Sequence, residues 1–207
     1  MTARPVRPFA VAVVAACAVV APLASPAQEP RATRVVTYAA VLPGPARSSG
    51  TCWTRSLAAP SRGDAYRCMA GNSIYDPCFV PPAQSAAAVC DVNPAGRGRG
   101  FTLRLTEPLP HEPAYGGSAP HPFLVELAGG EVCVPLTGTH ALLGTRSIGY
   151  ECSESRALRN GDLATGLLDE SFVPGRVWHA RKAVYRVGRT GRTSGTVSAV
   201  PLAAVWR

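Results

Sequence analysis

The cysteines constrain this chain more than any other feature of its sequence. Seven cysteines occur in 207 residues, and four of them lie in one stretch from residue 52 to residue 90. Chains that fold in an oxidising compartment use paired cysteines as cross-links, which replace part of the core that a short chain cannot build. We therefore expect a domain that is stapled by disulfides, provided that the chain is exported.

The N-terminus has the pattern of an export signal. Arg4 and Arg7 precede an apolar run from Phe9 to Ala24, and small residues follow at Ser25-Pro26-Ala27. A membrane-spanning helix needs about 20 apolar residues, more than this run supplies. The pattern predicts a signal peptide over residues 1–27, secretion of the remaining chain and no transmembrane span.

A second interpretation of the N-terminus is a lipoprotein signal. The segment Val14-Ala15-Ala16-Cys17 resembles the lipidation motif of bacterial lipoproteins, in which the cysteine becomes the lipid-bearing first residue. Either interpretation removes Cys17 from the cysteines that can pair within the domain.

The six remaining cysteines are an even set, which predicts three disulfides. Short loops close most easily, so we expect neighbours to pair. The expected pairs are Cys52 with Cys68, Cys78 with Cys90, and Cys133 with Cys152. None of these cysteines has the spacing of about two to four residues that zinc sites use, and we expect neither a metal nor another cofactor.

Most of the chain after the first cysteines predicts strands. Residues 122–136 read as a hairpin around Gly129-Gly130, and residues 177–187 and 196–206 read as a closing hairpin whose last strand Pro201 places at a sheet edge. One helix is expected near 62–71, because Ser61-Arg62-Gly63-Asp64 resembles a capping box. On that helix Asp64 and Arg67 form a charged pair.

The fold class expected from these patterns is mainly β, α+β at most. It is a single disulfide-stapled antiparallel β domain over residues 28–207, sandwich or barrel-like, with one short helix.

Three strings in residues 51–80 carry a resemblance. CWTRS, DAYRCMAGN and IYDPCF resemble secreted proteins of actinobacteria and other high-GC bacteria, in which a CW element, a DA-aromatic-RC element and a DPCF element recur in this order. The resemblance implies export and a disulfide framework, and it implies no particular activity.

The positive charge of the chain has two interpretations, the arginine-rich composition of a high-GC genome together with solubility, and attraction to an anionic envelope polymer. Lysine and arginine outnumber aspartate and glutamate by 21 to 13. Two glycine-flanked pairs, Arg97 with Arg99 and Arg189 with Arg192, have no acidic neighbours, and such guanidinium groups pair well with phosphate or carboxylate. These four arginines are the candidate binding residues. Nucleic acid is not expected, because aromatic residues do not interleave with the basic ones.

Asp64 and Asp76 are the candidate catalytic residues. They lie near Trp53, Tyr66 and Tyr75, and two carboxylates among aromatic side chains are what glycan cleavage uses. Each also has a structural explanation, since Asp64 can cap a helix and Asp76 can form a turn before proline. The proline-rich loop contains His111, Glu112 and His121, which could together bind a metal ion. The simpler interpretation is that both histidines are exposed loop residues without a ligand.

Taken together, the sequence favours a monomeric, non-catalytic exported module that binds an anionic envelope polymer or a protein partner. The alternatives are a small extracytoplasmic glycan hydrolase that uses Asp64 and Asp76, and an inhibitor of a foreign hydrolase.

Overall fold

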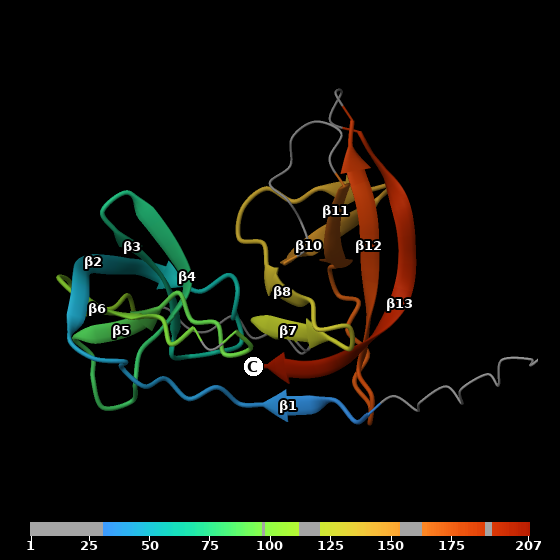
Figure 1. Cartoon of the computed structure of the whole chain (residues 1–207). Helices are drawn as coiled ribbons and strands as arrows, with labels where there is room; N and C mark the ends of the chain where they lie inside the picture. The colour runs from blue at the N-terminus through green and yellow to red at the C-terminus, as the bar shows by residue number, and fades with distance from the viewer. Residues whose placement is uncertain (1–30, 97, 112–120, 154–162, 189–191) are drawn as a thin grey trace, which may run out of the picture.

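The computed structural model describes residues 31–96, 98–111, 121–153, 163–188 and 192–207. The predicted signal peptide and Cys17 lie outside these ranges, as do Arg97, Glu112 and Arg189. Within the described residues the chain forms thirteen strands and no helix, arranged in two sheets (Figure 1). Over the same ranges, no helix is present that is long and apolar enough to cross a membrane.

The first sheet is a closed barrel of five strands, which occupies the left side of Figure 1. Consecutive strands pair antiparallel, and a parallel pairing of the first strand with the last closes the ring. Its strands are β2 (Ala46–Arg55), β3 (Ala65–Ala70), β4 (Ser73–Phe79), β5 (Ala87–Cys90) and β6 (Phe101–Leu105).

The second sheet contains the other eight strands, and β13 is its longest member. The first part of β13 pairs with β12, and its last residues pair with β7 on one side and with β1, in parallel, on the other. The strands are β1 (Arg34–Val36), β7 (Leu124–Leu127), β8 (Val132–Pro135), β9 (Leu142–Leu143), β10 (Arg146–Cys152), β11 (Leu163–Leu168), β12 (His179–Val187) and β13 (Thr193–Trp206).

The barrel is an insertion into this second sheet. Strand β1 precedes the barrel in the sequence and β7 follows it, yet both pair with β13. Figure 1 shows the chain leaving β1 for the barrel.

All three disulfides join the expected pairs of cysteines, Cys52–Cys68, Cys78–Cys90 and Cys133–Cys152. Each bond joins two residues that face each other directly on adjacent antiparallel strands, β2 with β3, β4 with β5, and β8 with β10. Their Cα atoms are 3.9, 4.2 and 3.9 Å apart. Directly opposed antiparallel residues approach most closely when they are not hydrogen-bonded to each other, which suits a cross-strand disulfide.

The helix expected near 62–71 is wrong. Residues 65–70 form β3, and the segment that resembled a capping box is the turn before it. A helix of about ten residues is marginal without tertiary support. As a strand, β3 pairs on both sides, and Cys68 bonds to Cys52 across one of these pairings.

Two further expectations about the sheets need correction. The fold is not purely antiparallel, because β1 pairs with β13 and β2 pairs with β6 in parallel. The last strand is not at an edge, since β13 has partners on both sides beyond Pro201. Pro201 lies where β13 changes partner from β12 to β7, so its missing N–H is tolerated there. The hairpin around Gly129-Gly130 is present as β7 and β8.

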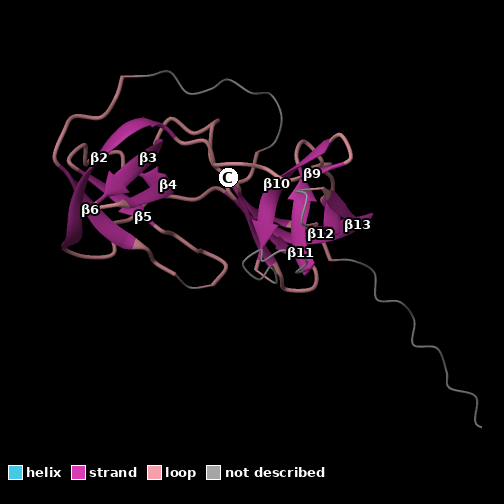
Figure 2. Ribbon diagram, turned by 90° about the horizontal axis from the view of Figure 1, so that it is seen from above, coloured by secondary structure: helices cyan, strands magenta, loops and turns pink. Residues whose placement is uncertain are grey.

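Each sheet has its own core, and a third cluster joins the two sheets. The barrel core surrounds Leu103 and two neighbouring disulfides, and the second sheet packs around Tyr150 and Trp178 on one side and Ile148 on another. The joining cluster brings Phe79 of the barrel against Phe123 and Trp206 of the second sheet. Figure 2, from above, shows the two groups of strands side by side with the connecting segments between them.

Candidate functional site

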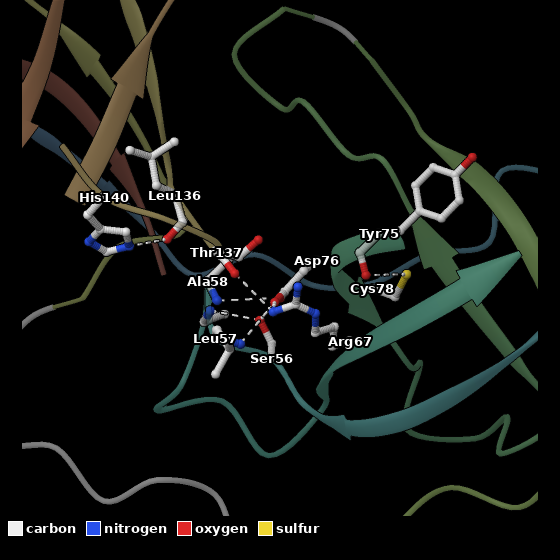
Figure 3. Close-up of polar contacts among 11 residues, drawn as sticks. Ser56, Leu57, Ala58, Arg67, Tyr75, Asp76, Cys78, Leu136, Thr137 and His140 are labelled. Carbon is white, nitrogen blue, oxygen red and sulfur yellow. Dashed lines mark hydrogen bonds and ion pairs between the residues drawn. The ribbon is translucent and has the colours of Figure 1, made fainter. Parts of the chain in front are cut away.

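Asp76 lies at the junction between the two sheets, at the position where β4 enters the cis peptide bond to Pro77. Its carboxylate accepts hydrogen bonds from the hydroxyl of Ser56 at 2.5 Å, from the backbone N–H of Leu57 at 3.1 Å and from that of Ala58 at 3.4 Å (Figure 3). Only 2% of the side chain is exposed. Asp76 thus holds the loop that leaves β2.

Arg67 continues this network across the junction. Its Nη1 lies 3.9 Å from Oδ2 of Asp76 and donates to the carbonyl oxygen of Thr137, at 3.0 Å, in the segment that follows β8 of the second sheet. Figure 3 shows the guanidinium between the two groups. The same guanidinium lies 5.9 Å from the ring centre of Trp53, a cation–π contact on the barrel surface. Arg67 therefore connects the barrel to the second sheet.

The protonation of Asp76 is governed by opposing causes. Burial raises the pKa of its carboxyl group, because a buried charge loses its hydration. The hydrogen bonds from Ser56, Leu57 and Ala58, and the charge of Arg67, act in the other direction. A raised pKa is typical of a general acid, but both oxygens of this carboxylate are occupied by the protein itself.

Asp64 has a different partner and surroundings. Its carboxylate accepts two hydrogen bonds from the Arg62 guanidinium, at 2.8 and 2.5 Å, and 31% of the side chain is exposed. The expected pair of Asp64 with Arg67 is not formed, since Arg67 faces Asp76 instead. The structure thus gives each candidate catalytic carboxylate its own arginine and its own structural contacts.

A histidine cluster lies beside this junction. A cavity of about 240 Å³ is lined by His121, His140 and Asp169 of the second sheet and Leu57 of the barrel. Nδ1 of His140 contacts both the Ser147 hydroxyl oxygen, at 2.9 Å, and Asp169 Oδ2, at 3.4 Å. A catalytic triad needs the hydroxyl and the carboxylate on opposite ring nitrogens. The arrangement therefore does not activate Ser147 as a nucleophile.

The two histidines that could bind a metal have different surroundings in the structure. His111 is exposed, Glu112 lies outside the described residues, and His121 is half-buried with Nδ1 3.4 Å from the Tyr150 hydroxyl. Among the residues that the structure describes, Cys68, Cys78 and Cys90 alone have the spacing of a metal site, and all three belong to disulfides.

The two candidate binding arginines that the structure describes belong to different sheets. Arg99 is exposed in the loop between β5 and β6 of the barrel, and Arg192 is exposed just before β13 in the second sheet. In Figure 1 the start of β13 lies at the top of the second sheet, away from the barrel. The structure does not bring Arg99 and Arg192 together.

Arg192 lines a cavity with a volume of about 700 Å³. The cavity lies between the segment 136–144, which includes β9, and strands β10 to β13. Its wall is mostly apolar, and it also contains Arg192, Glu151 and His140. Ligand cavities of proteins typically have about 300–1,000 Å³ and an apolar wall with a few polar groups. The apolar part comprises Leu136, Ala141, Leu142, Ala164, Tyr185 and Val187.

Sequence reasoning missed this cavity and most of its lining. Glu151 and Tyr185 belong to strands that are far apart in the sequence, and no local motif marks them. Arg192 alone was singled out, because of its glycine-rich surroundings.

No protein-family model, curated protein or solved structure matches this chain. Its function is therefore inferred from the cavity and from the side chains that line it.

Proposed function

We propose that this protein is an exported, non-catalytic module that binds a polypeptide partner in the cavity beside Arg192. The observation that carries the proposal is the cavity of about 700 Å³ in the second sheet, with an apolar wall and one charged group of each sign without an ion-pair partner among the described residues. Three disulfides and the leader-like N-terminus support export.

The contacts of the two aspartates support a non-catalytic role. Glycan cleavage needs one carboxyl group that reaches the glycosidic oxygen and a second that reaches water or the sugar. Asp76 is buried and accepts from three donors of the barrel, and Asp64 is held by Arg62. The hydrolase alternative requires both carboxylates to leave these partners before they meet a substrate.

The wall of the cavity favours a polypeptide over a polyanion. A uniformly anionic polymer pairs with Arg192, but it also meets the carboxylate of Glu151, which repels it. A highly charged chain gains no hydrophobic stabilisation from the apolar wall. Apolar side chains of a polypeptide gain about 25 cal/mol of binding free energy for each Å² of apolar surface that they bury there. A foreign hydrolase that this protein inhibits is one such partner.

The test compares two fractions of the envelope and culture medium of the source organism. One fraction is polymer freed of protein by protease, and the other is polypeptide freed of polymer. Mature protein is immobilised, and retained material is identified by mass spectrometry or sugar analysis. We expect a defined polypeptide to be retained and to rebind when purified.

Two variants establish whether the cavity is responsible. Thr139→Trp adds an indole to an exposed residue of the cavity wall, and Gln84→Trp adds the same group to an exposed barrel residue as the control. Retention should be lost in the first variant and kept in the second. Retention of polymer alone, weakened by salt and by Arg99→Ser together with Arg192→Ser, would favour the anionic polymer instead.

A further inference from the structure

Most polar groups in the wall of the 700 Å³ cavity already have partners within the protein. Nε2 of His140 lies 3.1 Å from the Leu136 carbonyl oxygen, and Nδ1 lies 2.9 Å from the Ser147 hydroxyl oxygen. The hydroxyl of Thr193 donates to the carbonyl oxygen of Leu142, which ties β9 to the start of β13. These groups support the wall and offer little to a ligand.

Arg192 and Glu151 differ from these groups. Both side chains line the cavity, both are exposed, and neither makes an ion pair with the other or with another described residue. The charge of Glu151 acts on the cavity wall, because it adds to burial in raising the pKa of Tyr185, which lines the same cavity. The cavity thus presents two separate, opposite charges over an apolar wall.

A ligand with a single charge satisfies only half of this arrangement. An anion pairs with Arg192 and is repelled by Glu151, and a cation does the opposite. A ligand that carries both charges at the ends of an apolar stretch pairs with both groups and covers the wall between them. Arg192 and Glu151 do not contact each other, so a ligand can lie between them. The cavity of about 700 Å³ is larger than a single amino acid, and a short peptide fills more of it while placing its two charges at opposite ends.

We propose that the cavity binds a short apolar peptide with both termini free, whose carboxylate pairs with Arg192 and whose ammonium group pairs with Glu151. This inference rests on the proposed function and narrows its polypeptide partner to a short peptide, which a folded hydrolase is not. The apolar side chains of the peptide contact residues such as Leu142 and Val187.

Four forms of one peptide test the assignment by calorimetric titration of the whole mature protein at pH 7. The peptide Leu-Ala-Leu carries both charges, its N-acetyl form only the carboxylate, its C-terminal amide only the ammonium group, and the doubly blocked form neither. We expect the free peptide to bind most tightly, and each block to weaken binding by about fivefold, the upper range for an ion pair of partly exposed groups.

Two charge variants assign the partners. In Arg192→Gln the free acid and the amide should bind equally, while acetylation still weakens binding. In Glu151→Gln the free amine and the acetylated form should bind equally, while amidation still weakens binding. Arg47→Gln removes an exposed arginine of the barrel and should leave all four affinities unchanged. Matching circular dichroism spectra of the variants show that they are folded.

Failure of this inference can be told apart from failure of the proposed function. In one outcome all four peptides bind with equal affinity, and Thr139→Trp lowers all four affinities. That result overturns the pairing of the termini with Arg192 and Glu151 but supports binding in the cavity. Absence of binding by all four overturns the inference, and the retention experiment with Thr139→Trp then decides the proposed function independently.

Discussion

Asp76 is held by donors that all come from one short segment, Ser56 to Ala58, and this arrangement predicts a large effect of its removal. Asp76→Ala leaves these three donors without their acceptor and removes the negative charge that Arg67 faces. Each unsatisfied buried group costs about 1–3 kcal/mol, so we expect the free energy of unfolding to fall by about 2–4 kcal/mol. Urea unfolding followed by tryptophan fluorescence measures this change.

Asp64→Ala is the matched control for Asp76→Ala. The side chain of Asp64 is 31% exposed and that of its partner Arg62 is 15% exposed, and ion pairs at the surface contribute up to about 1 kcal/mol. A loss of stability in Asp64→Ala as large as that in Asp76→Ala would contradict the structural role assigned to Asp76.

His121 makes the stability of the protein dependent on pH. Burial lowers the pKa of His121 below its ordinary value of 6.5, while Asp169 and a hydrogen bond to the Ala58 backbone oppose this change. As pH falls through about 6.5, the unfolded chain binds a proton at this residue before the folded chain does. The contribution of His121 to stability is therefore present above pH 6.5 and is lost as the pH falls toward the lower folded-state pKa.

The matching experiment compares unfolding of the wild type and of His121→Gln between pH 8 and pH 5. The difference in unfolding free energy between the two proteins should change across this range, with the wild type losing more stability on acidification. Parallel curves would show that His121 does not titrate differently on folding. Comparing the two proteins removes the contribution of the other histidines.

At the scale of strands, the disulfides were predictable and the helix was not. Cysteine number and the ease of closing short loops are local properties, and they identified all three pairs. The segment after Ser61 combines turn residues with a short polar and apolar pattern that suits a helix and a strand equally. Its outcome depends on pairing with β2 and β4 on either side, which only the barrel provides.

The Cys133–Cys152 bond joins β8 to β10 across a separation of 19 residues. A cross-link of this span restricts the unfolded chain, and its loss costs about 3 kcal/mol. We expect the double variant Cys133→Ala/Cys152→Ala to lose this amount of unfolding free energy, measured by thermal unfolding.

In the wild type, reduction should add the mass of six hydrogen atoms. A free thiol in folded, unreduced protein would contradict the framework.

At the scale of the whole molecule, the joining cluster couples the barrel to the second sheet. Phe123 is 2% exposed, and its ring lies 4.9 Å from that of Phe79 and 5.5 Å from that of Tyr38. Phe123→Ala should lower the unfolding free energy by about 3–5 kcal/mol. Because the lost contacts are those between the sheets, we expect calorimetry to resolve two transitions where the wild type has one. A single, merely shifted transition would show that other contacts suffice.

The candidate site is formed by strands that the fold of the whole chain brings together. For this reason the sequence alone identified few of its residues. The cavity wall comes from five separate parts of the chain, 136–144, β10, β11, β12 and the start of β13. Arg99 and Arg192 have the same local pattern of glycine and arginine, but only the topology decides that they belong to different sheets. Asp64 and Asp76 were likewise expected to act as a pair, because they lie close together in the sequence. In the structure Asp64 accepts from Arg62 and Asp76 accepts from Ser56.

The parallel pairing of β1 with β13 gives the molecule a mechanical property. Tension between residues 31 and 207 pulls β1 toward its beginning and β13 toward its end. Because the two strands are parallel, this force shears the pairing, and all hydrogen bonds of the pairing share the force at once. The paired residues are Arg34 with Ala204, Val35 with Val205 and Val36 with Trp206. The barrel lies between β1 and β7 in the sequence and stays outside the line of force until β1 detaches. This pairing of three residues thus shields the inserted barrel from stretching.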